Sequence, residues 1–103
     1  MRAGAWARYC VPVHPRQTAL VTGATSGIGR AFAERLARDG FDLILTGRRR
    51  ALLQSLAARI HREHAVAVTP VIAELSSQED LDALVRRIRR LPRLDVLVSN
   101  AGF

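Results

Sequence analysis

The sequence contains no lysine, and its 103 residues include a single cysteine, Cys10. Without a lysine the chain cannot form a lysine-dependent P-loop, which excludes that class of phosphate site. One cysteine excludes an internal disulfide and any multi-thiolate metal site. The three histidines are not accompanied by other residues in the spacing of a zinc site. No apolar run approaches the roughly 20 residues of a membrane span. We therefore expect a cytoplasmic protein with no metal and no membrane partner.

All 16 basic residues are arginine, against 9 acids, which gives a net charge of +7. Such an excess can indicate nucleic-acid binding. The arginines are spread along the chain, however, and most fall on the expected solvent faces of helices: Arg35, Arg38, Arg59, Arg62, Arg86, Arg87, Arg89 and Arg90. Dispersed charge is typical of a solvated surface, so we expect no nucleic-acid partner.

The chain is long enough for one domain. Residues 1–16 carry arginines, Trp6 and two prolines but no continuous apolar segment, so a signal peptide is not expected. They are interpreted as a disordered arm, a transit-like leader or an upstream extension of the true start. We expect the folded domain to occupy residues 17–103.

From residue 18 onward, short apolar runs alternate with helical patterns, which is typical of βαβ units and a parallel sheet. The expected strands are residues 18–22, 41–46, 65–72 and 94–99. Pro70 places the third of these at a sheet edge. This order predicts a partial three-layer Rossmann-type α/β fold, with a parallel sheet of strand order 3-2-1-4 and three helices. The first two helices should cover one face and the third the other.

Each helix is expected from its apolar spacing and its end signals. The first carries Ile28, Phe32, Ala33 and Leu36 and ends at Gly40. For the second the expected buried stripe is Leu52, Leu53, Leu56, Ala57 and Ile60. The third follows the capping-box spacing of residues 76–80 and has an apolar face of Leu81, Leu84, Val85, Ile88 and Leu91, with Pro92 as its stop.

The strongest functional motif is the glycine-rich turn of residues 22–29 (TGATSGIG), between the first strand and the first helix. Gly23 permits a tight turn, Gly27 lets the backbone approach a pyrophosphate, and Gly29 allows close helix–strand packing. The N–H groups and the positive end of the helix dipole would then hold the diphosphate. In this setting the turn predicts a dinucleotide-binding site.

After the second strand, dinucleotide folds place an acid for the ribose 2′-hydroxyl or an arginine for a 2′-phosphate. This sequence has Arg48, Arg49 and Arg50 there and no acid. A guanidinium can bind phosphate oxygens in a bidentate manner, so NADP is favoured over NAD. Arg48 is the first candidate and Arg49 the second, whereas Arg50 is expected to be a solvated charge at a helix start.

At this point the sequence resembles a known family. Residues 22–29 match the T-G-x-x-x-G-I-G signature of the short-chain dehydrogenase/reductase superfamily, and residues 94–102 (LDVLVSNAG) resemble its fourth-strand N-N-A-G signature. The resemblance covers about residues 17–103. It implies an oxidoreductase family, with hydride transfer between NADPH and a carbonyl or alcohol substrate in a complete enzyme.

The resemblance also implies roles for individual positions. The pyrophosphate would be wrapped by Gly23, Thr25, Ser26, Gly27, Ile28 and Gly29. Glu74 and Leu75 occupy the family's Asp-Leu position, where the acid accepts from the adenine amino group, although Glu is one methylene longer than Asp. The ribose would lie along Asn100, Ala101 and Gly102. Ser99 stands where the family usually has its first Asn.

The family's Tyr-x-x-x-Lys pair is absent, since the chain has no lysine and its only tyrosine, Tyr9, precedes the fold. A phenol with a pKa of ~10 needs such a cation for acid–base work near neutral pH. We expect no catalytic residue here and no activity from this chain alone. A non-catalytic nucleotide-binding or interaction module, or a gene-fragment remnant, remains the alternative. The bare fourth strand also suggests self-association or a partly molten state.

Overall fold

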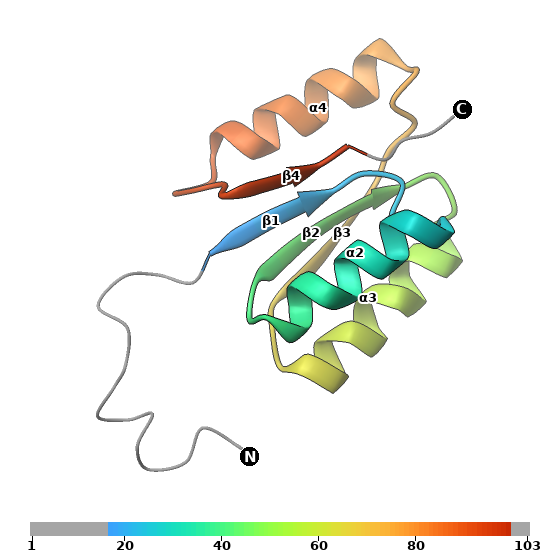
Figure 1. Cartoon of the computed structure of the whole chain (residues 1–103). Coiled ribbons are helices and arrows are strands. Elements are labelled where there is room, and N and C mark those ends of the chain that lie inside the picture. Colours follow the sequence, from blue (N-terminus) through green and yellow to red (C-terminus); the bar gives the residue numbers. More distant parts are fainter. Residues whose placement is uncertain (1–16, 100–103) are drawn as a thin grey trace.

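The computed structural model describes residues 17–99, and these form one parallel sheet with helices on both faces (Figure 1). In chain order the elements are β1 Thr18–Val21, α2 Gly27–Arg38, β2 Asp42–Gly47, α3 Arg50–His64, β3 Val68–Ile72, α4 Gln78–Arg89 and β4 Val96–Val98. The sheet order is β3-β2-β1-β4. The predicted α/β class and strand order are therefore confirmed. Residues 1–16 and 100–103 lie outside the described part.

The main core lies between the sheet and helices α2 and α3. Alternate residues of the central strands face it, because strand side chains point to opposite faces in turn. It is built from Ala19, Val21, Leu43 and Leu45 of the sheet with Ala33, Ala37, Leu53, Leu56, Ala57 and Ile60 of the helices. The small alanines allow α2 to pack close to the strands, which fixes where its N-terminus lies.

A second, smaller core lies on the opposite face under α4. There Leu20 and Ile44 of the sheet pack with Leu84 of α4. The expected split of the helices, two on one face and one on the other, is confirmed by these two clusters and is visible in Figure 1.

Several apolar residues of the predicted helical stripes are exposed rather than buried. Ile28 is 66% exposed and Phe32 48%, so the buried face of α2 is formed by Gly29, Ala33 and Ala37 instead. Leu52 is 50% exposed, because α3 turns Leu53 and Leu56 toward the sheet. On α4 only Leu84 is fully buried, whereas Leu81 and Val85 are exposed.

Several predicted element boundaries also differ, and the fourth strand, expected over residues 94–99, covers only Val96–Val98. The third strand was expected from residue 65, but Ala65 ends α3 in the left-handed region with φ 55° and β3 begins at Val68. At the start of α4, only one of the two hydrogen bonds of the expected capping box forms. Ser77 caps α4 by accepting from the Asp80 N–H, while the Asp80 carboxylate accepts from the Glu74 N–H at 2.7 Å rather than returning to the cap residue.

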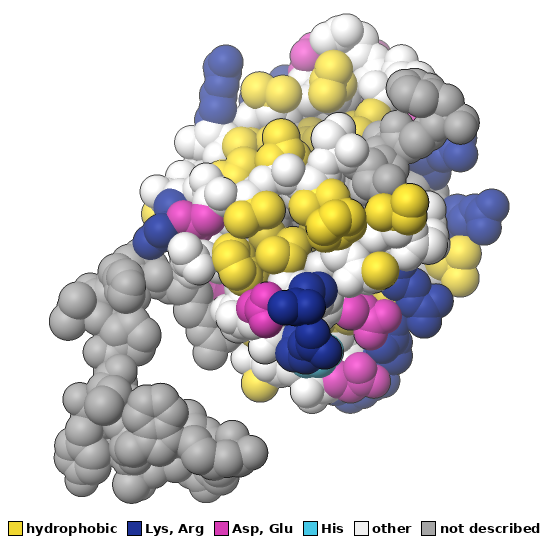
Figure 2. Space-filling model, viewed as in Figure 1, with side chains coloured by type: hydrophobic (Ala, Val, Ile, Leu, Met, Phe, Trp, Pro, Cys, Tyr) yellow, Lys and Arg dark blue, Asp and Glu magenta, His cyan; other side chains and the backbone are white. Residues whose placement is uncertain are grey.

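One face of the described fold carries exposed apolar side chains. Figure 2 shows hydrophobic side chains gathered over the region of β4, β1 and α2. The exposed large apolar residues of α2 are Ile28 and Phe32, while Val96 and Val98 of β4 are partly buried against the main core. In the described sheet β4 pairs with β1 alone, so its other edge is open. Leu97, on the opposite face of β4, is 59% exposed.

No helix among residues 17–99 is both long enough and apolar enough to cross a membrane.

Candidate functional site

The candidate site lies at the carboxyl end of the sheet. All four strands run parallel, so the segments that follow β1, β2, β3 and β4 meet at one edge. The chain moves outward from β1 to β2 and β3, then returns to the other side of β1 as β4. This reversal is a topological switch point, and open α/β sheets bind ligands in the crevice beside it.

The glycine-rich turn is fixed against the neighbouring strands. Gly23 has φ 61°, a left-handed conformation that glycine adopts without the Cβ penalty of other residues. On its two sides, the Ala24 N–H donates to the Thr46 carbonyl at 3.0 Å and the Thr22 N–H donates to the Val98 carbonyl at 2.9 Å. The turn therefore bridges the ends of β2 and β4.

The N-terminus of α2, the positive end of its dipole, lies at this turn. Its N-cap residue, Ser26, does not cap the helix with its side chain, because the hydroxyl donates to the Gly23 carbonyl at 2.8 Å. The first turn of α2 contains no acid. Leading N–H groups of a helix have no intrahelical acceptor, and together with the dipole they attract an anion.

The other predicted members of the turn occupy distinct positions. Among residues 17–99, a Cβ added at Gly27 would meet no heavy atom within 4 Å apart from its chain neighbours and the backbone of α2, so the backbone is open to a ligand there. Gly29 is buried against the sheet, as close helix–strand packing requires, and Thr25 lies beside Gly47 at the end of β2. The side chain of Ile28 is apolar and exposed. Only the backbone of Ile28 could therefore contact a phosphate.

Arg48 and Glu74 are brought together, although they are 26 residues apart in the sequence. Arg48 follows β2 and Glu74 follows β3, and Arg48 Nη1 donates to Glu74 Oε2 at 3.2 Å. Arg49 is the N-cap residue of α3 and is exposed. Leu75 is partly buried and packs against the smaller core. Asn100, Ala101 and Gly102 lie outside the described residues.

The Glu74 carboxylate is held in its charged form. Hydrogen bonding from Ser76, followed by the Arg48 guanidinium, lowers the pKa of Glu74. Its Oε1 atom accepts from the Ser76 N–H at 3.3 Å. The sequence pointed to Glu74 through its position after the third strand, where the family resemblance implies an acid that contacts adenine. The pairing with Arg48 had no signal in the local pattern, because it depends on β2 and β3 being neighbours in the sheet.

Two other features of the described residues do not form competing sites. Glu34, Glu63 and His64 place possible ligand atoms within 4.8 Å of one another. The Arg59 guanidinium already contacts both carboxylates there, which disfavours a cation. A hollow of about 210 Å³ between β3 and α4 is lined by residues such as Asp80, Arg86 and Arg87, and none of the glycine-rich turn residues borders it.

Comparison with known proteins gives the class to which this fold and site belong. The family model described as short chain dehydrogenase matches residues 17–103. Sulfoacetaldehyde reductase 2 of Chromohalobacter salexigens is 46% identical over 85 residues, which cover 81% of this chain and 32% of that protein.

Solved structures agree. A short-chain dehydrogenase from Sphingobium yanoikuyae in complex with NADPH matches with a TM-score of 0.81 and 46% identity, covering 84% of this chain and 34% of that one. The L-sorbose reductase of Gluconobacter frateurii, complexed with NADPH and L-sorbose, matches with a TM-score of 0.79 and 34% identity, covering 85% of this chain and 34% of that one.

The site thus belongs to a Rossmann-type nucleotide-binding fold. The chain is a member of the short-chain dehydrogenase family. It spans about a third of the length of the curated relatives it matches.

Proposed function

We propose that this chain forms the NADP(H)-binding part of a short-chain dehydrogenase/reductase. The carrying observation is that the glycine-rich turn and Arg48 lie at the carboxyl ends of adjacent strands, β1 and β2. The glycine-rich turn would hold the diphosphate and Arg48 would hold the 2′-phosphate. NADP carries both groups. The complexes of two similar structures with NADPH support the same cofactor.

The residues present fit this cofactor. The open space above Gly27 leaves the backbone of α2 approachable, and the first turn of α2 has no acid to repel a diphosphate. The exposed Arg48 guanidinium offers planar N–H donors that match phosphate oxygens. When bound, NADPH supplies a hydride. The residues described here would bind and orient it through the diphosphate and the 2′-phosphate.

In the complete enzyme we propose that the hydride passes between NADPH and a carbonyl or alcohol substrate. This 103-residue sequence has no lysine, so it cannot itself supply a Tyr-x-x-x-Lys pair. We therefore expect the chain alone to bind cofactor without catalysing hydride transfer. The absence of lysine also favours the second candidate function, a non-catalytic nucleotide-binding module. This candidate would use the same site.

The test is a titration of the 103-residue chain with NADPH and with NADH, followed by fluorescence or calorimetry. We expect NADPH to bind more tightly, and Arg48→Ala to weaken NADPH by roughly tenfold while changing NADH by less than about twofold. Failure of both nucleotides to bind at millimolar concentration would refute the proposal. Hydride transfer to a carbonyl by this chain alone would refute the expected inactivity.

A further inference from the structure

Glu74 is fixed by the turn between β3 and α4. Its N–H donates to Asp80 Oδ2 at 2.7 Å and its carbonyl accepts from the Ser77 N–H at 2.8 Å. Its side chain is held as well, by the Ser76 N–H at 3.3 Å. Both the backbone and one carboxylate oxygen are therefore anchored, which leaves Oε2 facing Arg48.

Arg48, by contrast, is loosely held. Its side chain is 73% exposed, and within residues 17–99 its guanidinium makes no hydrogen bond or ion pair other than the one with Glu74. The partner that sets its position is therefore an anchored carboxylate. An aspartate at residue 74 would end one methylene earlier, so the contact depends on the longer side chain found here.

We infer that Glu74 is a specificity-determining residue that weakens the preference for a 2′-phosphorylated nucleotide by neutralising Arg48. This inference rests on the proposed function. A 2′-phosphate bound to Arg48 would share the guanidinium with Glu74 and would lie close to its negative charge. A ribose 2′-hydroxyl carries no charge and would not be repelled. Any contact of Glu74 with the adenine amino group would be common to NADPH and NADH, so the charge of Glu74 lowers the ratio of NADPH affinity to NADH affinity.

The size of the effect follows from the exposure of the pair. Both side chains are more than 40% exposed, so water and salt screen their interaction. Removing the charge of Glu74 should therefore change NADPH affinity by about two- to fivefold, within the range typical of exposed charge pairs. The depressed pKa of Glu74 agrees with a carboxylate that is charged whenever the nucleotide binds near neutral pH.

The experiment compares Glu74→Gln with the unmodified 103-residue chain in titrations with NADPH, NADH and the fragment 2′,5′-ADP. Glutamine keeps the size and an acceptor oxygen but removes the charge. We expect the affinities for NADPH and 2′,5′-ADP to rise about two- to fivefold relative to the affinity for NADH. Glu79→Gln is the matched control, because Glu79 is an exposed acid in the first turn of α4 with no contact to Arg48.

A second comparison isolates the role of Arg48. In an Arg48→Ala background, Glu74→Gln should have at most half its effect on NADPH, because the charge acts through the guanidinium. An unchanged or lower ratio of NADPH affinity to NADH affinity in Glu74→Gln would overturn the inference while leaving the proposed function intact. If neither protein binds any of the three ligands, both the inference and the proposed function fail.

Discussion

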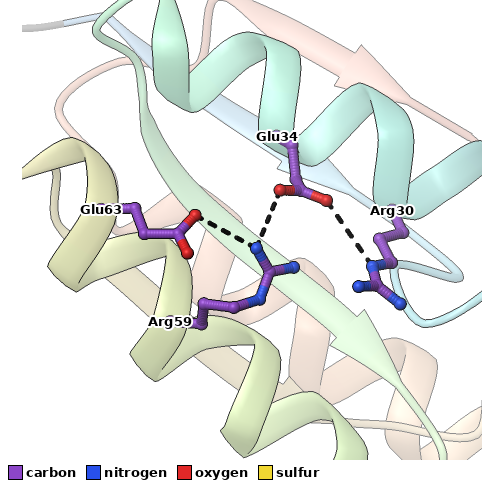
Figure 3. Close-up of polar contacts among 4 residues, drawn as sticks. All are labelled: Arg30, Glu34, Arg59 and Glu63. Atoms are coloured by element: carbon purple, nitrogen blue, oxygen red, sulfur yellow. Dashed lines mark hydrogen bonds and ion pairs between the residues drawn. The ribbon is translucent and has the colours of Figure 1, made fainter.

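Arg59 of α3 donates to Glu34 of α2 at 2.9 Å and joins the two helices that cover one face of the sheet. The same Nη1 atom contacts Glu63, one turn along α3, at 3.2 Å (Figure 3). The hydrogen bond from Arg59 lowers the pKa of Glu34. Because the Arg59 side chain is only 28% exposed, this contact is less screened than an ordinary surface pair.

We expect Arg59→Ala to lower the free energy of unfolding by about 1 kcal/mol, because it removes a part-buried charge pair between α2 and α3. Urea unfolding followed by circular dichroism measures this change. Arg62→Ala is the control, since Arg62 is exposed on the same helix and makes no ion pair among the described residues. Equal losses in the two variants would show that the contact with Glu34 contributes nothing.

Asp95 connects the beginnings of β1 and β4, and its charge should make stability depend on pH. It accepts from Arg93 Nε at 2.9 Å and, through Oδ2, from the Thr18 N–H at 2.8 Å. The Arg93 guanidinium, followed by that N–H, lowers the pKa of Asp95. A carboxyl whose pKa is lower in the folded state stabilises the fold above its unfolded pKa of about 3.9, and that contribution is lost as pH falls through the folded pKa.

We therefore expect Asp95→Asn to be less stable than the unmodified chain at pH 7, with the difference shrinking from about pH 4 downward. Asparagine keeps an acceptor for the Thr18 N–H, so the comparison isolates the charge. Urea midpoints measured from pH 7 to pH 2 provide the check. Asp82→Asn, on exposed α4, should show a smaller pH-dependent difference. A difference for Asp95→Asn that stays constant down to pH 2 would contradict the assignment.

The open edge of β4 should promote self-association of this chain. Leu97 is 59% exposed on that strand, and an apolar edge strand with free backbone groups pairs readily with a second copy. We expect Leu97→Lys to shift the protein toward the monomer in sedimentation velocity, because lysine on an edge strand opposes such pairing. Leu52→Lys, at a similarly exposed position on α3, should leave the association unchanged. A monomer before any substitution would rule out this association.

Alternation of apolar runs with helical patterns was sufficient to predict the strand order and the side on which each helix packs, because right-handed crossovers leave few alternatives. The degree of burial was predicted less well. Phe32 and Leu52 have the spacing of core residues, yet they are exposed, because Ala33 and Leu53 are the residues turned toward the sheet. Spacing defines an apolar face but not how much of it the neighbouring elements cover.

For the site, the position of the glycine-rich turn followed from its motif, because strand, turn and helix are contiguous in the sequence. The pairing of Arg48 with Glu74 could not be predicted in the same way, since it requires β2 and β3 to be neighbours in register. The sequence identifies the two residues and shows that Glu74 stands where the family has Asp. Their contact follows only from the arrangement of the strands in the sheet.

Gly23 and Gly27 lie in the same turn, and they should respond differently to the same substitution. Gly23 has φ 61°, where an added Cβ costs about 1–2 kcal/mol, so Gly23→Ala should lower the free energy of unfolding by that amount. Within the described part of the chain, a Cβ at Gly27 meets no heavy atom within 4 Å beyond its chain neighbours and the backbone of α2. Gly27→Ala should therefore leave stability unchanged or raise it by up to about 1 kcal/mol.

Binding separates the two roles further. At Gly27 the added methyl group would occupy the space through which a diphosphate approaches the N–H groups of α2, so we expect NADPH affinity to fall at least roughly tenfold. Because we expect this variant to keep its fold, a loss of NADPH affinity would not be attributable to unfolding. Thermal unfolding and NADPH titration on the same samples make the comparison. Unchanged NADPH affinity in Gly27→Ala would mean that the diphosphate does not lie over this turn, and the proposed binding mode would be wrong.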